Sequence, residues 1–110
     1  MRKKRWRAFE LDDMCTVAAR SWQEAAEWFM KECGLERDDI NYPPPEVDMK
    51  RQYMSYTIRL IPTKRRRRAT AYTLVPYEGY PCVDIPLKRA LRYELRKNKP
   101  QKPFILAVYP

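Results

Sequence analysis

The chain has 110 residues, 45% hydrophobic and 34% charged, a composition that excludes an intrinsically disordered protein and predicts one folded domain over residues 1–110. Its net charge of +9 is unevenly distributed, because residues 1–49 hold eight Lys/Arg against eleven Asp/Glu, whereas residues 50–110 hold fifteen against three. A surface as basic as the second half predicts attraction to phosphates or to an acidic protein partner.

No segment predicts export or insertion into a membrane. The basic start is followed by residues 6–13, in which four charged residues interrupt what would be the apolar region of a signal peptide. The longest apolar runs are far shorter than the roughly 18 to 20 residues that cross a bilayer. We therefore expect a cytoplasmic protein without a membrane partner. Cys15, Cys33 and Cys82 fit neither a disulfide framework nor a metal pair, and Cys33 falls on an apolar helical stripe, which predicts a reduced, buried thiol.

The first elements in the chain are predicted to be two strands. Residues 4–11 and 14–19 are rich in β-formers, and Asp12 and Asp13 between them are typical turn residues. This pattern predicts a β-hairpin, with a single long, bent strand as the alternative.

A helix is predicted over residues 21–33. Ser21 and Glu24 have the spacing of a capping box, in which each side chain accepts a hydrogen bond from a backbone amide at the helix start. The apolar residues that follow have helical spacing and form one face: Trp22, Ala25, Ala26, Phe29, Met30 and Cys33. Gly34 and then Leu35 predict a Schellman stop.

The middle of the chain is predicted to hold two strands between loops. Residues 36–48 are acidic and contain three consecutive prolines, which favours a semi-rigid connecting loop. Residues 53–60 and 71–75 alternate apolar and polar side chains, as strands do, and we expect them to pair as a hairpin with Lys64–Arg68 at its tip. Residues 76–81 contain Pro and Gly and predict a loop.

A second helix is predicted from the Asp84 cap to about Asn98, with an apolar stripe on one side. Its other side is cationic and contains Lys88, Arg89, Arg92, Arg96 and Lys97. Residues 104–109 form a short apolar run of the buried-strand type. The order β-β-α-β-β-α-β predicts an α+β fold, with a mostly antiparallel sheet of about five strands and two helices.

Three cationic clusters, at residues 2–7, 64–68 and 88–102, predict binding to nucleic acid, DNA or RNA, or to a nucleoprotein, largely through phosphates. The alternative is a solubilising surface, partly neutralised by the acidic first half. Aromatic rings among the cations, such as Tyr93, could stack on bases. Trp28 lies off the apolar helix face and is predicted to be exposed at a protein interface. The expected binding residues are Lys3, Lys4, Arg5, Lys64, Arg65, Arg66, Arg67, Arg68, Lys88, Arg89, Arg92, Tyr93, Arg96 and Lys97.

The sequence offers little catalytic chemistry. It contains no histidine, which excludes Ser-His-Asp and Cys-His mechanisms, and its two glycines cannot form a Gly-rich phosphate loop. We therefore expect a protein that is not an enzyme and needs no metal or cofactor. A metal-dependent nuclease is the remaining alternative, with Mg²⁺ bound by Glu10, Asp12 and Asp13, although turn formation explains the aspartate pair more simply.

Short motifs near both ends resemble those of small uncharacterised proteins encoded in bacteriophage and prophage genomes. They are residues 9–13, 18–21, 24–25, 33–35, 93–96 and 103–107. The resemblance implies a phage, hence viral, or mobile-element accessory protein in the cytoplasm of a bacterial host. Because such proteins often inhibit host defence, it also implies a second hypothesis, an anti-defence inhibitor of the anti-CRISPR type that binds a host protein. The chain differs from this group in its basic middle, and in having Cys15 and Thr16 where the group has Trp.

Overall fold

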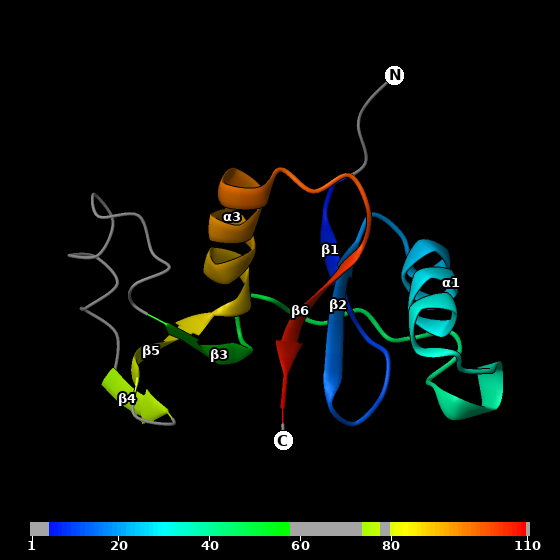
Figure 1. The fold of residues 1–110 in the computed structure, drawn as a ribbon, viewed down its shortest axis with the longest axis horizontal. Coiled ribbons are helices and arrows are strands. Elements are labelled where there is room, and N and C mark those ends of the chain that lie inside the picture. The colour runs from blue at the N-terminus through cyan, green and yellow to red at the C-terminus, as the bar shows by residue number, and fades with distance from the viewer. Residues whose placement is uncertain (1–4, 58–73, 78–79, 110) are drawn as a thin grey trace. The chain divides into compact units, whose positions relative to one another are not determined.

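The computed structural model describes residues 5–57, 74–77 and 80–109, with the backbone alone for 74–77, 80 and 81. Within these residues the chain forms six strands and two α-helices, and all strand pairs are antiparallel (Figure 1). The predicted α+β class is confirmed. The strands divide between two three-stranded sheets, each of which belongs to its own compact unit.

The two units also differ in charge. Unit 1 comprises Met1–Asp48 and Pro100–Pro110, and unit 2 comprises Met49–Lys99. Unit 2 has 14 Lys/Arg and three Asp/Glu, whereas unit 1 has nine and eleven. The predicted change from acidic to basic sequence at residue 49 therefore coincides with the boundary between the units.

The sheet of unit 1 has the order β1-β2-β6. Its strands are β1 (Arg7–Glu10), β2 (Cys15–Ala19) and β6 (Phe104–Val108). The predicted hairpin is confirmed, since β1 and β2 pair in antiparallel fashion. In the turn between them, Asp12 Oδ1 accepts hydrogen bonds from the amides of Met14 at 2.8 Å and Cys15 at 2.6 Å. On its other side β2 pairs with β6, so β2 is the central strand and residues 16–19 are buried.

Helix α1 (Trp22–Cys33) begins where the capping box predicted. Ser21 Oγ accepts a hydrogen bond from the Glu24 amide at 3.2 Å. Glu24 Oε1 accepts one from the Arg20 amide at 3.1 Å, one residue before the expected donor. The two bonds satisfy backbone donors that a helix start leaves without intrahelical partners.

The end of α1 confirms the predicted Schellman motif. Gly34 has φ 64°, and the amides of Gly34 and Leu35 both donate to the Met30 carbonyl. The prediction that Cys33 is buried is wrong, since this residue is exposed. Cys33 is the last residue of the helix, where the apolar stripe has already passed the edge of the core.

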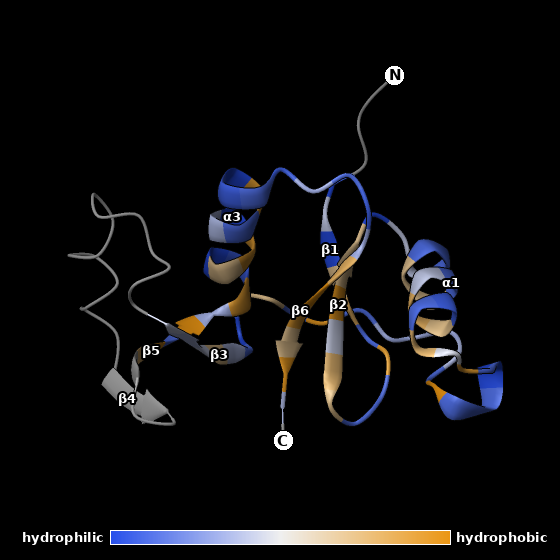
Figure 2. Ribbon diagram, in the orientation of Figure 1, coloured by the Kyte–Doolittle hydropathy of each residue, from blue (hydrophilic) through white to orange (hydrophobic). Residues whose placement is uncertain are grey.

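The core of unit 1 lies between α1 and the sheet, where α1 packs on β2. Its buried members are Phe9, Leu11, Val17, Ala19, Ala25, Ala26 and Phe29. Figure 2 shows hydrophobic residues along β2 and β6. Trp28 is half-buried and packs against this cluster, which corrects the expectation of an exposed ring.

The acidic segment 36–48 does more than connect α1 to unit 2. After a short 3-10 helix (Arg37–Asp39), it runs beside β1, where Glu46 forms a β-bridge with Phe9. The Glu10 amide donates to the Pro45 carbonyl at 2.9 Å, and the Val47 amide donates to the Ala8 carbonyl at 2.8 Å. This segment therefore covers the outer edge of β1, which would otherwise present unpaired backbone groups.

The sheet of unit 2 has the order β3-β5-β4 and corrects the predicted hairpin. Its strands are β3 (Tyr53–Thr57), β4 (Leu74–Tyr77) and β5 (Tyr80–Pro86). β3 and β4 do not pair with each other, because β5 lies between them and pairs with both. The sequence predicts a loop at residues 76–81 and a helix cap at Asp84, whereas residues 74–77 and 80–86 form β4 and β5. The sequence did not predict β5 because it contains Pro81 and Pro86, and proline is rarely found in a central strand.

Helix α3 (Leu87–Asn98) follows β5 directly. Its N-cap is Pro86, which corrects the predicted Asp84 cap, and Asp84 lies within β5 opposite Ser55. The helix start is held by the segment before β3, since the Leu87 amide donates to the Gln52 carbonyl at 2.8 Å. The buried residues around α3 are Tyr56, Val83, Ile85, Leu87, Ala90, Leu91 and Tyr93.

Candidate nucleic-acid interface

The predicted cationic side of α3 faces away from the core of unit 2. Leu87, Ala90 and Leu91 are buried where the helix packs on β3 and β5, so the opposite side of the helix is turned outward. There Lys88 and Arg89 are half-buried, and Arg92 and Arg96 are exposed. Lys97, four residues after the buried Tyr93, is exposed in the last turn of the helix. Figure 2 shows α3 as mostly hydrophilic along its visible surface.

Glu94, the one carboxylate in α3, is bound to neighbours other than these cations. The Tyr56 hydroxyl donates to its Oε1 at 2.6 Å, and the Asn98 amide nitrogen donates to its Oε2 at 2.7 Å. Within the described residues no carboxylate forms an ion pair with Arg92, Arg96 or Lys97. The positive charge of these three side chains therefore faces solvent.

Two small cavities lie next to each other along this side of α3. One of about 180 Å³ is lined by Lys50, Pro86, Lys88, Arg89 and Arg92. The other, of about 110 Å³, is lined by Arg89, Arg92, Tyr93 and Arg96. They share Arg89 and Arg92. Lys50 was not predicted as a binding residue, and it reaches the helix start because the Lys88 amide donates to the Met49 carbonyl at 3.1 Å.

The structure corrects the predicted role of Tyr93. Its side chain is 3% exposed, and its ring packs against the ring of Tyr56 with the centroids 5.6 Å apart. No base can stack on a ring in this position. The Tyr93 hydroxyl is buried and has no hydrogen-bond partner among the described residues, although Tyr93 lines the smaller cavity.

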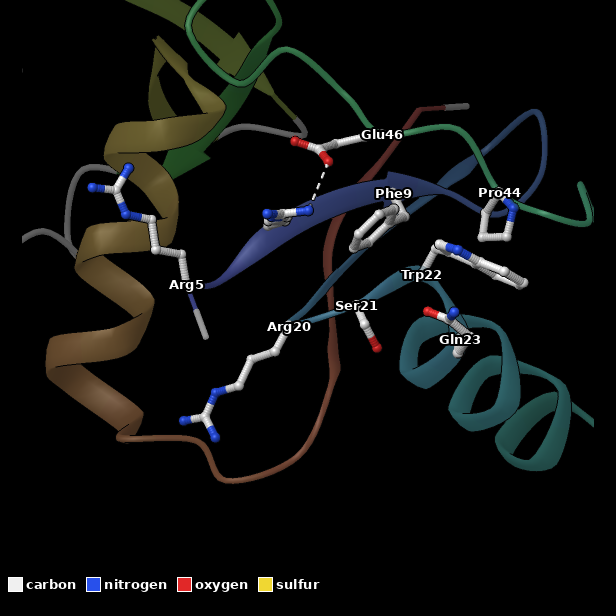
Figure 3. A pocket seen from close by; sticks show the side chains of 9 residues that line it. Arg5, Phe9, Arg20, Ser21, Trp22, Gln23, Pro44 and Glu46 are labelled. Carbon is white, nitrogen blue, oxygen red and sulfur yellow. Dashed lines mark hydrogen bonds and ion pairs between the residues drawn. The ribbon is translucent and has the colours of Figure 1, made fainter. Parts of the chain in front are cut away.

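The other predicted binding residues are not part of this helix. Lys3, Lys4 and Lys64–Arg68 lie outside the described residues. Arg5 is exposed in unit 1 and lines a cavity of about 370 Å³ (Figure 3). Its lining residues are Arg5, Arg7, Phe9, Arg20, Ser21, Trp22, Gln23, Pro44 and Glu46.

The cavity of unit 1 is cationic but partly neutralised. Arg7 forms an ion pair with Glu46 at 3.4 Å, drawn as a dashed line in Figure 3, and both side chains are 54% exposed, so water screens this pair. The Arg20 guanidinium lies over the Trp6 ring, 5.0 Å from its centroid, and is held by that contact. Arg20 was not predicted as a site residue, because it belongs to no charge run in the sequence.

Among the described residues, no helix combines the length and apolar character needed to cross a membrane. No group of three or more His, Cys, Asp and Glu in that part of the chain is arranged to hold a metal ion. Asp12, a predicted candidate for Mg²⁺, accepts the two turn hydrogen bonds from Met14 and Cys15.

No protein-family model, curated protein or solved structure matches this chain. The resemblance to phage-encoded accessory proteins stays a prediction.

Proposed function

We propose that the protein is a non-enzymatic module that binds the phosphate backbone of nucleic acid through one surface, the α3 face. This face consists of Lys88, Arg89, Arg92 and Arg96 on one side of α3, with Lys50 beside the helix start and Lys97 in its last turn. The observation that carries the proposal is that the first four of these cations follow one side of a helix while its carboxylate, Glu94, is bound to Tyr56 and Asn98. Lys and Arg in such a row neutralise phosphates and release counterions, which drives binding without regard to base sequence.

The length of the helix suits several phosphates. At about 1.5 Å per residue, the 12 residues of α3 extend over about 18 Å. A strand of B-form DNA advances about 3.4 Å per nucleotide, so about five nucleotides can lie alongside the face. The proposal therefore predicts several simultaneous phosphate contacts from this helix.

An acidic protein partner fits the α3 face less well than nucleic acid. Stable protein interfaces depend on aromatic or apolar anchors surrounded by polar residues. Tyr93, the predicted aromatic on this helix, is buried, and no exposed large hydrophobic side chain is found on α3. A protein partner is thus a competing outcome of the test below.

Binding can be measured by fluorescence anisotropy with single-stranded DNA, duplex DNA and RNA between 50 and 200 mM salt. A wild-type protein that contacts six phosphates should lose about 10³-fold in affinity for duplex DNA over this range. The triple variant Arg92→Gln, Arg96→Gln and Lys97→Gln should bind less tightly. Its slope of log affinity against log salt should be lower by about 2.7, or about 0.9 for each lost contact.

A matched control removes the same charge from unit 1 through Lys31→Gln, Arg37→Gln and Lys102→Gln, all at exposed positions. If net charge alone were responsible, both triple variants would weaken binding equally, and the α3 face would not be the site. If the wild type binds no nucleic acid but retains a protein from a nuclease-treated bacterial extract, the competing hypothesis of a protein partner replaces this one.

A further inference from the structure

The two outer edges of the sheet in unit 1 differ in what covers them. The order β1-β2-β6 makes β1 and β6 the edge strands. Segment 36–48 covers the outer edge of β1 through the bridge between Phe9 and Glu46. Among the described residues, no strand or bridge pairs with the outer edge of β6. Such an edge presents backbone donors and acceptors that can pair with another chain.

The backbone of Val108 points toward this outer edge. In an antiparallel ladder, pairs that bond to each other alternate with pairs whose N–H and C=O groups point apart. The register places Tyr109 opposite Met14, and the Tyr109 amide donates to the Met14 carbonyl at 2.7 Å, so this pair is of the bonded kind. The next pair, Val108 and Cys15, is therefore of the other kind. Cys15 agrees, because its carbonyl accepts from the Leu11 amide on the side of β1.

Two side chains of β6 form an exposed apolar surface beside this edge. Ile105 is 41% exposed and Val108 is 54% exposed. They lie opposite Val17 and Cys15, and a β-bulge in the ladder puts them on one face of the sheet although they are three residues apart. Val17 on the same face is buried in the core that α1 covers. The apolar face of the sheet thus continues into solvent along β6.

A second copy of β6 is the partner that suits this edge. Natural edge strands are commonly protected by charged side chains or by a covering segment, and Phe104–Val108 contains no charged residue. Uncharged strands of high β-propensity pair readily with identical strands. Antiparallel pairing of two identical strands is also symmetric, so each copy offers the groups that the other needs. Unit 1 has nine Lys/Arg and eleven Asp/Glu, so its copies repel each other little.

We propose that two copies of the protein associate through β6, by antiparallel pairing that joins their unit 1 sheets into one sheet of six strands. This inference goes beyond the proposed function and does not depend on nucleic acid. A pair of five-residue strands is smaller than the roughly 1,200 Å² interfaces of stable complexes, so the dimer should be weak. We expect it to form at protein concentrations of about 100 µM and above.

Sedimentation equilibrium without nucleic acid tests the association. Between about 10 µM and about 1 mM protein, the average mass should rise from that of one chain toward that of two. A mass that stays at one chain over this range would overturn the inference and leave the proposed function intact. A mass that rises beyond two chains would also overturn it, because a symmetric pair of edges is complete with two copies.

The double variant Ile105→Lys and Val108→Lys places cations on the edge and should remain monomeric at about 1 mM. The matched control, Gln23→Lys and Gln101→Lys, adds the same charge to exposed positions of unit 1 and should associate as the wild type does. Association of both variants would place the interface elsewhere. Loss of association in both would attribute it to net charge. Either result contradicts pairing through β6.

Val108→Pro separates the backbone from the side chain and serves if the lysine variant fails to fold. Proline keeps an apolar residue at position 108 and removes only an N–H that β2 does not use, a position where edge strands tolerate proline. This variant should retain its fold and stay monomeric. A folded Val108→Pro that associates as strongly as the wild type would exclude a strand-to-strand dimer.

Amide hydrogen exchange measured by NMR locates the interface in the wild type. The Val108 amide should exchange rapidly in dilute protein and about fivefold more slowly when four-fifths of the chains are paired, because exchange requires the open edge. The Tyr109 amide, which already donates to Met14, should be protected at both concentrations and is the internal control. An unchanged Val108 rate in a sample that sedimentation shows to be dimeric would overturn the inference.

Discussion

The hydrogen bond from the Tyr56 hydroxyl to Glu94 Oε1, 2.6 Å long, joins β3 to α3 and orients the one carboxylate of this helix. Burial raises the pKa of Tyr56 above its ordinary value, and the bond to Glu94 raises it further. Glu94 is two residues from both Arg92 and Arg96, so it lies on another side of the helix, and its hydrogen bonds to Tyr56 and Asn98 lie within unit 2.

Glu94→Gln should lower the free energy of unfolding by about 1 to 3 kcal/mol, measured by urea denaturation. Glutamine can accept from Tyr56, but its amide nitrogen would then meet the Asn98 donor, so one of the two bonds is lost. The affinity for nucleic acid should not fall, because the charge of the α3 face is intact. A loss of affinity as large as that of the triple variant would show that Glu94 positions the binding residues.

Stability at high pH should depend on Tyr56. The folded protein holds the Tyr56 proton more tightly than the unfolded chain, whose tyrosines titrate near pH 10. The contribution of this group is therefore complete below about pH 10 and declines as the pH rises above it. Tyr56→Phe should have a lower Tm at neutral pH and a smaller decline in Tm above pH 10. Parallel curves for the two proteins would contradict this role.

The three cysteines should react with iodoacetamide at different rates. Cys33 is exposed and should be modified first, whereas Cys82 is 4% exposed and should react last. Burial, and then the charge of Asp12, raise the pKa of the Cys15 thiol, so its reactive thiolate is scarce and its rate should be intermediate. Mass spectrometry of peptides after brief labelling gives the order. Slow labelling of Cys33 would restore the sequence-based prediction that it is buried.

Gly34→Ala should lower the free energy of unfolding by about 1 kcal/mol, measured by urea denaturation. The φ of 64° is unfavourable for alanine, and an added Cβ would meet no atom within 4 Å, so the backbone conformation alone accounts for the effect. Gly34→Asn should lose less, since asparagine tolerates this region. Equal losses in both variants would point to a cause other than the left-handed conformation.

The elements that the sequence predicted well are those with local causes. The Ser21 cap, the Gly34 stop and the Asp12 turn each depend on a side chain or backbone group within a few residues, and all three are found in the structure. β5 has the opposite character. Pro81 and the nearby Gly79 favour a loop locally, and β5 becomes a central strand because it pairs with β4, which immediately precedes it, and with β3, which is distant in sequence.

The candidate site likewise contains residues that the sequence predicted and residues that it missed. Helical periodicity predicted the cationic residues of α3, since it depends only on the spacing of apolar residues. It did not predict that Tyr93 is buried, because the ring that packs against Tyr93 is that of Tyr56 in β3, which is distant in sequence. Lys50 was missed for a similar reason, as a backbone bond between Met49 and Lys88 brings it to the helix.

Unit 2 is inserted into unit 1, since the chain leaves the first unit after Asp48 and returns to it at Pro100. During synthesis on the ribosome, β2 must therefore wait for β6 until the whole basic insert has been translated. A protease that cuts a single connection would leave the two pieces associated through the β2–β6 ladder. The basic unit can be released intact only by cleavage at both connections.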